Sequence, residues 1–377
     1  MEEMENIEIK IPKNKNNIFV KLILIILSFF AGAIGMYLVI YFFPAEFVET
    51  INTTKIVKDV SITDTGLSEA VGKIYDAVVV VENYKGETLK GSGTGFVYEN
   101  KDGKAYILTN NHVISGGTKV YVSFTNGEKK EAEVLGSDTY ADIAVLKINS
   151  FDGIKVASIG SSEKAKIGDT VFAVGAPLDI SYSWTVTRGI LSGKDRLIEI
   201  NSSQTTGATS DWVMSAIQTD AAINSGNSGG PLANANGEVI GITSLKLVNN
   251  GVEGMGFAIP IETALKYAEI IVKGEEIKRP YLGVSMYNIS EISTKYYNDE
   301  LTKTGVYVSS VEEGSPADKA GLKEGDIIVG LNDTEIENVA YLKYNLYKYN
   351  VGEKVTLSIY RNDKQRSIEV TLGENSN

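Results

Sequence analysis

The most informative stretch of the chain reads Gly226-Asn227-Ser228-Gly229-Gly230-Pro231-Leu232. Glycines on both sides of a serine let the backbone turn tightly and bring its amides close to a ligand. A nucleophilic serine needs such amides to bind the oxyanion that develops on its substrate. We therefore predict Ser228 as a nucleophile, with the amides of Gly226 and Ser228 forming an oxyanion hole and Asn227 between them. The alternative is an ordinary loop of small residues.

A serine nucleophile needs a base, and the chain has a single histidine. His112 comes just after a β-like run, Ala105–Thr109, and an imidazole titrates near neutral pH, as a general base should. Asp142 is the only acid of the apolar run Ala141–Lys147, and its carboxylate could hold the imidazole in one tautomer. Taken singly, His112 could be structural and Asp142 could cap a strand. The order His, Asp, Ser, however, is that of the chymotrypsin-type triad.

Composition excludes several other kinds of chemistry. The chain has no cysteine, which excludes disulfides, thiolate metal sites and a cysteine nucleophile. A single histidine also excludes a His-rich metal site. Because 36 basic and 48 acidic residues give a net charge of −12, nucleic acid is not expected as a partner.

An uncharged apolar run, residues 22–43, predicts a transmembrane helix. At about 1.5 Å per residue it spans the roughly 30 Å hydrocarbon layer of a bilayer. Lysines are concentrated before the run, so the positive-inside rule places residues 1–21 in the cytoplasm and the remainder outside the cell membrane. A cleaved signal peptide is the alternative, but its apolar region is usually about 7–15 residues. The longer run, with a poor cleavage site after Phe43, favours an uncleaved signal anchor in the lipid bilayer.

Beyond the anchor the chain divides into three parts. Residues 44–66 are polar and are expected to form a stalk. Residues 67–273 contain many short β-rich runs separated by turn signals, which favours a mostly β domain, either one large domain or a pair of barrels. Helical spacing over Ile261–Val272 predicts a closing helix. After a charged linker, residues 280–374 are expected to form a smaller domain of mixed strands and helices.

Several motifs in one order resemble the HtrA (DegP/DegS-like) family of trypsin-like serine proteases. These motifs are Gly91–Phe96, Leu108–Val113, Ala141–Lys147, Ile217–Asn224, Gly226–Leu232 and Gly256–Pro260. The resemblance implies two six-stranded β-barrels with a triad between them, in which His112 is the general base, Asp142 orients it and Ser228 is the nucleophile. It also implies hydrolysis of peptide bonds through an acyl-enzyme, without a metal or cofactor. Assembly into a homotrimer or a larger oligomer is implied by the resemblance alone.

Asn227 departs from the pattern of secreted trypsin-like zymogens. Those proteins carry an aspartate at this position, which pairs with a newly cut N-terminus, and an asparagine cannot form that ion pair. We therefore expect control by loop ordering rather than by N-terminal cleavage. The candidate loops are Asp179–Trp184, Asn201–Trp212 and Val248–Gly254. The strand Gly241–Ser244 should line one wall of the substrate pocket, and its lack of an acid favours a small or apolar side chain at the cleavage site.

Tyr281-Leu282-Gly283-Val284 resembles the carboxylate-binding loop of a PDZ domain. Successive amides in such a loop capture a C-terminal carboxylate while the peptide adds to the sheet as a strand. Three further matches follow in Gly314–Ala317, Ala320–Leu322 and Gly325–Ile328. A plain buried strand is the alternative for the loop. The resemblance predicts a domain that senses or tethers C-terminal peptides.

The combined prediction is a membrane-anchored serine endopeptidase that cuts unfolded or mislocalised extracytoplasmic proteins. Two alternatives stay open from the sequence. One is a regulatory protease that cleaves a single specific partner, and the other is a non-catalytic chaperone or adaptor built on a decayed protease fold.

Overall fold

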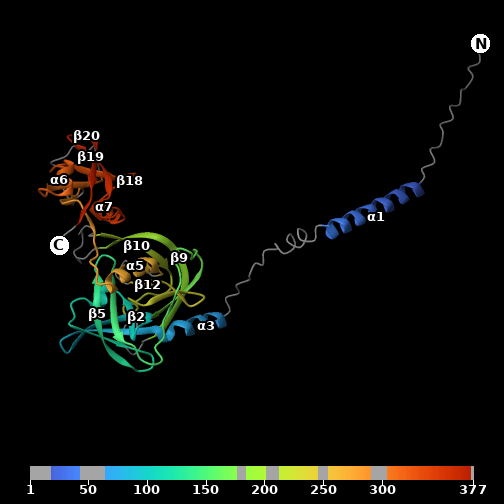
Figure 1. Cartoon of the computed structure of the whole chain (residues 1–377), viewed down its shortest axis with the longest axis horizontal. Helices are drawn as coiled ribbons and strands as arrows, with labels where there is room; N and C mark the ends of the chain where they lie inside the picture. Colours follow the sequence, from blue (N-terminus) through green and yellow to red (C-terminus); the bar gives the residue numbers. More distant parts are fainter. Residues whose placement is uncertain are drawn as a thin grey trace, which may run out of the picture. The chain divides into compact units, whose positions relative to one another are not determined.

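The computed structural model describes residues 18–42, 64–175, 184–200, 212–244, 254–289 and 304–374. The chain divides into two compact units, residues 1–61 and 62–377. The first unit contains one described helix, α1 (Ile18–Phe42) (Figure 1). Its segment Val20–Val39 is long and apolar enough to cross a membrane, and none of that segment is buried by protein. The helix contains the predicted span except its last residue, Phe43, and lacks the burial of a soluble core helix. Residues 1–17 of the predicted tail and residues 44–63 of the predicted stalk lie, like Phe43, outside the described residues.

The second unit begins with a closed barrel whose strands pair in the order β1-β2-β3-β6-β5-β4. The strands are β1 (Val78–Lys85), β2 (Thr88–Lys101), β3 (Lys104–Thr109), β4 (Lys119–Ser123), β5 (Lys129–Asp138) and β6 (Ile143–Asn149). Successive side chains point to opposite faces of a strand, and in β1 both faces are buried. Val79 and Val81 fill the barrel, whereas Val78 joins a core shared with the next barrel. This double burial explains why β1 is a continuous apolar run rather than an alternating one.

A second barrel follows, in which β11 pairs with both β8 and β12 and so closes the ring β8-β9-β10-β13-β12-β11. β7 lies outside the ring, parallel to β12. The strands are β7 (Ser158–Ile159), β8 (Thr170–Gly175), β9 (Thr185–Ile200), β10 (Trp212–Thr219), β11 (Pro231–Asn234), β12 (Glu238–Thr243) and β13 (Gly256–Pro260). The predicted pair of six-stranded barrels is confirmed.

Helices pack against the core that the two barrels share. Helix α3 (Asp64–Ile74) and the short 3-10 helix η1 (Tyr75–Ala77) lead into β1. Helix α5 (Ile261–Val272) follows β13 and buries Ala264, Ala268 and Ile271 in the shared core. The apolar spacing of the sequence predicted α5 because residues three and four apart lie on one helix face.

The C-terminal domain has its own apolar core and a sheet in the order β15-β16-β17-β19-β20. Its strands are β14 (Pro280–Tyr281), β15 (Val284–Asn288), β16 (Val306–Val311), β17 (Ile327–Leu331), β18 (Thr334–Glu335), β19 (Lys354–Arg361), β20 (Lys364–Thr371) and β21 (Gly373–Glu374). Two helices complete it, α6 (Pro316–Ala320) and α7 (Val339–Leu346). Ser315 caps the start of α6 through its hydroxyl, and Gly321 ends the helix at a φ of 83°.

A partly buried ion pair lies at the turn between β5 and β6. Asp138, at the end of β5, accepts a hydrogen bond from the Ala141 amide at 2.6 Å and pairs with Arg279 of the linker. Burial opposes the charge on Arg279, but attraction to Asp138 outweighs it and raises the pKa of the guanidinium. The bond to Ala141 fixes the backbone immediately before Asp142.

Candidate active site

His112 lies on a single helical turn directly after β3. Asn110 is extended at the N-cap position, and α4 (Asn111–Ile114) carries the histidine at the edge of the first barrel. Val113 and Ile114 anchor the turn in the barrel core, while the His112 side chain keeps 33% of its surface exposed. The imidazole is therefore fixed at its base and accessible at its ring.

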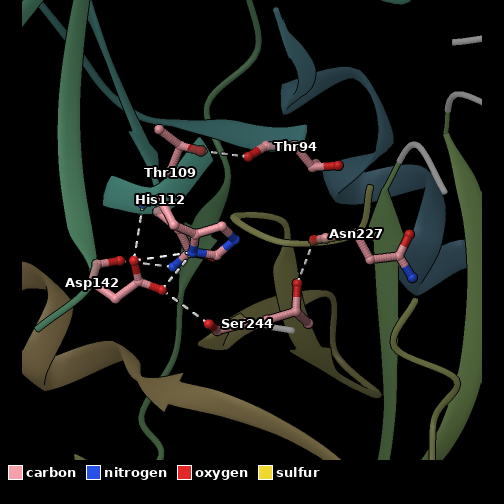
Figure 2. Close-up of polar contacts among 8 residues, drawn as sticks. Thr94, Thr109, His112, Asp142, Asn227 and Ser244 are labelled. Atoms are coloured by element: carbon pink, nitrogen blue, oxygen red, sulfur yellow. Dashed lines mark hydrogen bonds and ion pairs between the residues drawn. The ribbon is translucent and has the colours of Figure 1, made fainter. Parts of the chain in front are cut away.

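Asp142 turns its carboxylate toward that imidazole. Its oxygens lie 2.8 and 3.0 Å from His112 Nδ1, and one accepts from the His112 amide at 3.1 Å (Figure 2). A carboxylate only accepts, so Nδ1 carries the proton and Nε2 is left as the basic nitrogen. Asp142 is fully buried and adopts the left-handed region at a φ of 53°. These contacts disfavour the alternative that Asp142 only caps a strand, because its carboxylate binds the side chain and the amide of His112.

The backbone of Asp142 also holds the segment that carries the base. Its carbonyl accepts from the Asn110 side-chain amide at 2.9 Å and from the Asn111 amide at 3.2 Å. Acid and base are therefore joined by side-chain and main-chain bonds together, which limits their relative motion.

The Ser228 loop packs directly against the histidine-bearing segment. A Cβ on Gly229 would lie 2.1 Å from the Thr94 carbonyl oxygen and 2.4 Å from Thr109 Oγ1. A Cβ on Gly93 would lie 2.7 Å from Val113 and 3.1 Å from the Ser228 carbonyl oxygen. Glycines at these two positions allow the two barrels to approach, and Ser228 is brought beside the turn that carries His112. Ser228 itself is buried, with 4% of its surface exposed.

Thr94 of β2 connects the two barrels at this point. Its hydroxyl donates to the Gly226 carbonyl at 2.7 Å, and its amide donates to the Ser228 carbonyl at 2.8 Å. Gly226 adopts a φ of 101°, which L-residues rarely reach. The Asn227 amide donates to the Asn224 carbonyl at 3.0 Å and is not directed at an oxyanion. Gly226 and Ser228 stay the predicted oxyanion donors, and Asn227 is the spacer between them.

Known proteins share this architecture. Residues 93–242 match the trypsin-like peptidase domain and residues 280–372 match the PDZ domain. The serine protease Do-like HtrA of Bacillus subtilis is 43% identical over 296 residues, which are 76% of this chain and 65% of that protein. A crystal structure of the serine endoprotease from Yersinia pestis matches with a TM-score of 0.62 at 31% identity, covering 82% of this chain and 98% of that one. This chain belongs to the HtrA family of serine proteases.

A further HtrA-family relative is the periplasmic pH-dependent serine endoprotease DegQ of Escherichia coli. It is 37% identical over 287 residues, covering 76% of this chain and 60% of that protein. The chain thus spans about two thirds or less of the length of these two curated HtrA relatives. The family is established over both folded domains.

Two polar residues of this HtrA site were missed from the sequence. Ser244 donates from its hydroxyl to Asp142 at 3.0 Å, although the sequence predicted only that its strand lines the substrate pocket (Figure 2). Thr94 lies within the quoted motif Gly91–Phe96, but no role was predicted for it. Both act through contacts between residues far apart in the chain, so no local pattern could have indicated them.

The predicted control loops lie outside the described residues, except for one residue at the end of each. Trp184 donates from its indole nitrogen to the Val78 carbonyl at 3.0 Å. Trp212 begins β10 and is buried, and Gly254 precedes β13. Control by loop ordering stays a prediction.

Asn227 is buried below the nucleophile, with 1% of its surface exposed. Its side-chain amide donates to the Ala222 carbonyl at 3.2 Å. A Cβ on Gly175 would lie 2.6 Å from Asn227 Oδ1, so this side chain fits only beside a glycine. The side chain is packed as part of the second barrel, and control without N-terminal cleavage stays a prediction.

The predicted carboxylate loop of the HtrA PDZ domain lies between β14 and β15. Gly283 adopts a φ of 83°, and a Cβ there would lie 2.2 Å from the Cβ of Ser315. The Leu282 carbonyl accepts from the Ala317 amide at 2.8 Å, and the Gly283 carbonyl accepts from the Glu312 amide at 3.0 Å. Because N–H and C=O of one planar peptide point in opposite directions, the amides of Gly283 and Val284 face away from these partners.

The strand that follows lies at one end of its sheet. β15 pairs only with β16 among the described strands, so no described strand occupies its other edge. Within the loop, the hydrogen bond with Glu312 raises the pKa of the Tyr281 hydroxyl. The geometry agrees with capture of a C-terminus by Tyr281–Val284, which stays a prediction.

Proposed function

We propose that this chain is a membrane-anchored serine endopeptidase that hydrolyses peptide bonds of unfolded or mislocalised extracytoplasmic proteins. The observation that carries the proposal is the 2.8 Å contact between His112 Nδ1 and buried Asp142, with the Ser228 loop packed on the same turn. The HtrA-family relatives named as serine proteases support it.

Hydrolysis proceeds in two halves with His112 as the proton carrier. Nε2 takes the proton from Ser228 Oγ as that oxygen attacks the substrate carbonyl, and the Gly226 and Ser228 amides stabilise the resulting oxyanion. The protonated imidazole, stabilised by Asp142, then gives its proton to the leaving amine, and an acyl-enzyme remains. Water attacks the ester in the same way and releases the new C-terminus.

The membrane assignment rests on α1 and on the family. An apolar helix with no protein cover is stable in a bilayer, and DegQ is named periplasmic. The excess of lysine before the span supports a cytoplasmic N-terminus with protease and PDZ domains outside. Assembly into a homotrimer or larger oligomer is proposed on family grounds and is measured by sedimentation of the detergent-solubilised chain.

The PDZ domain is proposed to sense or tether the C-termini of unfolded substrates or of other C-terminal peptides. The Gly283 and Val284 amides, which point away from the partners of the loop carbonyls, and the edge of β15 that no described strand occupies support this role. The intact contact between His112 and Asp142 disfavours a decayed, non-catalytic adaptor. Cleavage of one regulatory partner is the remaining alternative.

The test is casein hydrolysis by the full chain in detergent, with and without a peptide ending in apolar residues. Ser228→Ala should abolish activity, whereas Ser367→Ala, an exposed serine of β20, should retain it. Equal activity in wild type and Ser228→Ala contradicts the nucleophile. Many unrelated proteins accumulating in cells that carry Ser228→Ala support quality control, and a single accumulated protein supports the regulatory alternative.

A further inference from the structure

All three backbone carbonyls around the nucleophile are held by hydrogen bonds. Thr94 holds the carbonyls of Gly226 and Ser228, as described above. The carbonyl between them, that of Asn227, accepts from Thr243 Oγ1 at 2.6 Å. Thr243 is the last residue of β12. One threonine from each barrel therefore donates a hydrogen bond to a carbonyl of the loop.

The Asn227 carbonyl belongs to the peptide unit that also contains the Ser228 amide. A trans peptide is planar, and its C=O and N–H point in opposite directions. Thr243 Oγ1 and the Gly230 amide, at 2.9 Å, both bind the oxygen side of this unit. The Ser228 N–H must therefore point away from both of these partners. Its direction is set by the hydrogen bonds at the other end of the same plane.

Thr243 is itself tightly fixed. Its amide donates to the Gly230 carbonyl at 2.9 Å and its carbonyl accepts from the Gly229 amide at 2.8 Å. The side chain is fully buried, and a β-branched residue has few χ1 rotamers. Its hydroxyl has one proton and lies nearer to the Asn227 oxygen than to the Gly230 oxygen, at 2.6 against 3.1 Å. The proton therefore goes to Asn227.

We propose that Thr243 is a positioning residue for the oxyanion hole, acting through the Asn227–Ser228 peptide. The hydroxyl holds this peptide in the orientation that aims the Ser228 amide at the developing oxyanion. Thr243 is fully buried, and the hydroxyl contacts given for it are with backbone carbonyls of the loop. The inference rests on the proposed function, since an oxyanion hole has a role only if Ser228 is a nucleophile.

The contribution should appear in kcat rather than in KM. An oxyanion donor binds the tetrahedral intermediate more strongly than the planar carbonyl of bound substrate. Complete loss of such a donor lowers kcat by roughly 10²–10³-fold. Loosening a donor that is still held by Gly230 should cost less, so we expect roughly a tenfold loss of kcat in Thr243→Val.

The test compares Thr243→Val, which keeps the shape and loses the hydroxyl, with Thr243→Ser, which keeps the hydroxyl. Each full-length variant is assayed in detergent for kcat and KM on a chromogenic peptide and for affinity toward the matching peptide aldehyde. The aldehyde forms a tetrahedral adduct with an oxyanion on the nucleophile, so it reports the hole. Thr170→Val, another buried threonine of the second barrel, is the control for loss of a buried hydroxyl, and thermal melting checks folding.

Support requires that Thr243→Val lose about tenfold in kcat and in aldehyde affinity at unchanged KM, with recovery in Thr243→Ser. The inference is overturned if wild type is active and Thr243→Val matches it, or if Thr243→Ser is as poor as Thr243→Val. If Thr243→Val fails to fold, Thr243→Ala, which adds no atoms to the core, is measured by the same criteria. Inactive wild type and Ser228→Ala together would instead contradict the proposed function.

Discussion

His112 and Asp142 of the first barrel are held mainly by each other, whereas Ser228 of the second barrel is held through the backbone of its loop. The acid and base share two close contacts between their side chains and a third through the His112 amide. Around the nucleophile, Thr94 and Thr243 bind the backbone carbonyl oxygens of Gly226, Asn227 and Ser228.

The two arrangements answer different chemical needs. A buried carboxylate must have donors, because an unpartnered buried charge costs several kcal/mol, and these donors also fix the imidazole. The nucleophile loop carries no charge at rest and must instead aim two amides. Substitutions at the His112–Asp142 pair should therefore impair proton transfer. Substitutions around the Ser228 loop should weaken binding of the oxyanion, because its amides no longer point at it.

The largest expected effect is in the first arrangement. Asp142→Asn should lower kcat on the order of 10⁴-fold, because an amide donating to Nδ1 selects the wrong imidazole tautomer. The measurement is steady-state hydrolysis of a chromogenic peptide, with Asp152→Asn on the same barrel as the control, since Asp152 is exposed. A loss below tenfold would mean that Asp142 does not orient the base, and the comparison would fail.

Gly229→Ala tests the second arrangement by displacing the whole loop. The new Cβ would meet the Thr94 carbonyl at 2.1 Å, so the loop must shift, and a displacement of about 1 Å costs on the order of 10²-fold in rate. Gly86→Ala is the matched control, because Gly86 also has a positive φ, of 63°, but no atom within 4 Å of the added Cβ. Equal kcat losses in the two variants would attribute the effect to backbone strain rather than to the approach of the barrels.

Ser244→Ala sharpens the comparison, because Ser244 follows β12 of the second barrel but donates a hydrogen bond to Asp142 of the first barrel. Asp142 would lose the hydroxyl at 3.0 Å and retain His112. We expect kcat to fall roughly three- to tenfold, in line with loss of about 1 kcal/mol from one hydrogen bond to a carboxylate. An unchanged kcat and an unchanged pH–rate profile would show that His112 alone suffices to hold Asp142.

Glu262 gives the smallest effect, on stability alone. This carboxylate in the first turn of α5 accepts from Ser161 Oγ at 2.7 Å and also from Ser162. Burial opposes its charge, but the hydrogen bonds from Ser162 and Ser161 outweigh it and lower the pKa of Glu262. A lowered pKa stabilises the fold above the unfolded-state value, near 4.3, and this contribution is lost as the pH falls through the folded-state pKa.

Glu262→Gln should therefore melt at a slightly lower temperature than wild type at pH 7. The loss in free energy of unfolding should be less than about 1 kcal/mol, because the group is partly solvated. The difference should shrink below pH 4. Calorimetry at pH 7 and below pH 4 measures this difference in stability. A difference that grows on acidification would mean that the pKa of Glu262 is raised rather than lowered by folding.

Much of the architecture follows from local patterns. Helix α5 was predicted from Ala264, Leu265, Ala268 and Ile271, because helical spacing places such residues on one face. Three of them are buried, and Leu265 packs partly buried against the same core. The glycines that flank Ser228 predicted a tight loop before any contact was known. The position of Ser244 against Asp142 had no such signal, since it depends on how β12 ends relative to the other barrel.

By itself, the sequence determined the fold class, the family and the residue types available for catalysis. A single histidine, no cysteine and a Gly-Asn-Ser-Gly turn leave few alternatives, because each reaction demands particular side chains. Only the tertiary structure decided which atoms meet. Hydrogen bonds depend on distances of about 3 Å and on direction, and residues such as Thr94 and Thr243 acquire their roles when two barrels close on one loop.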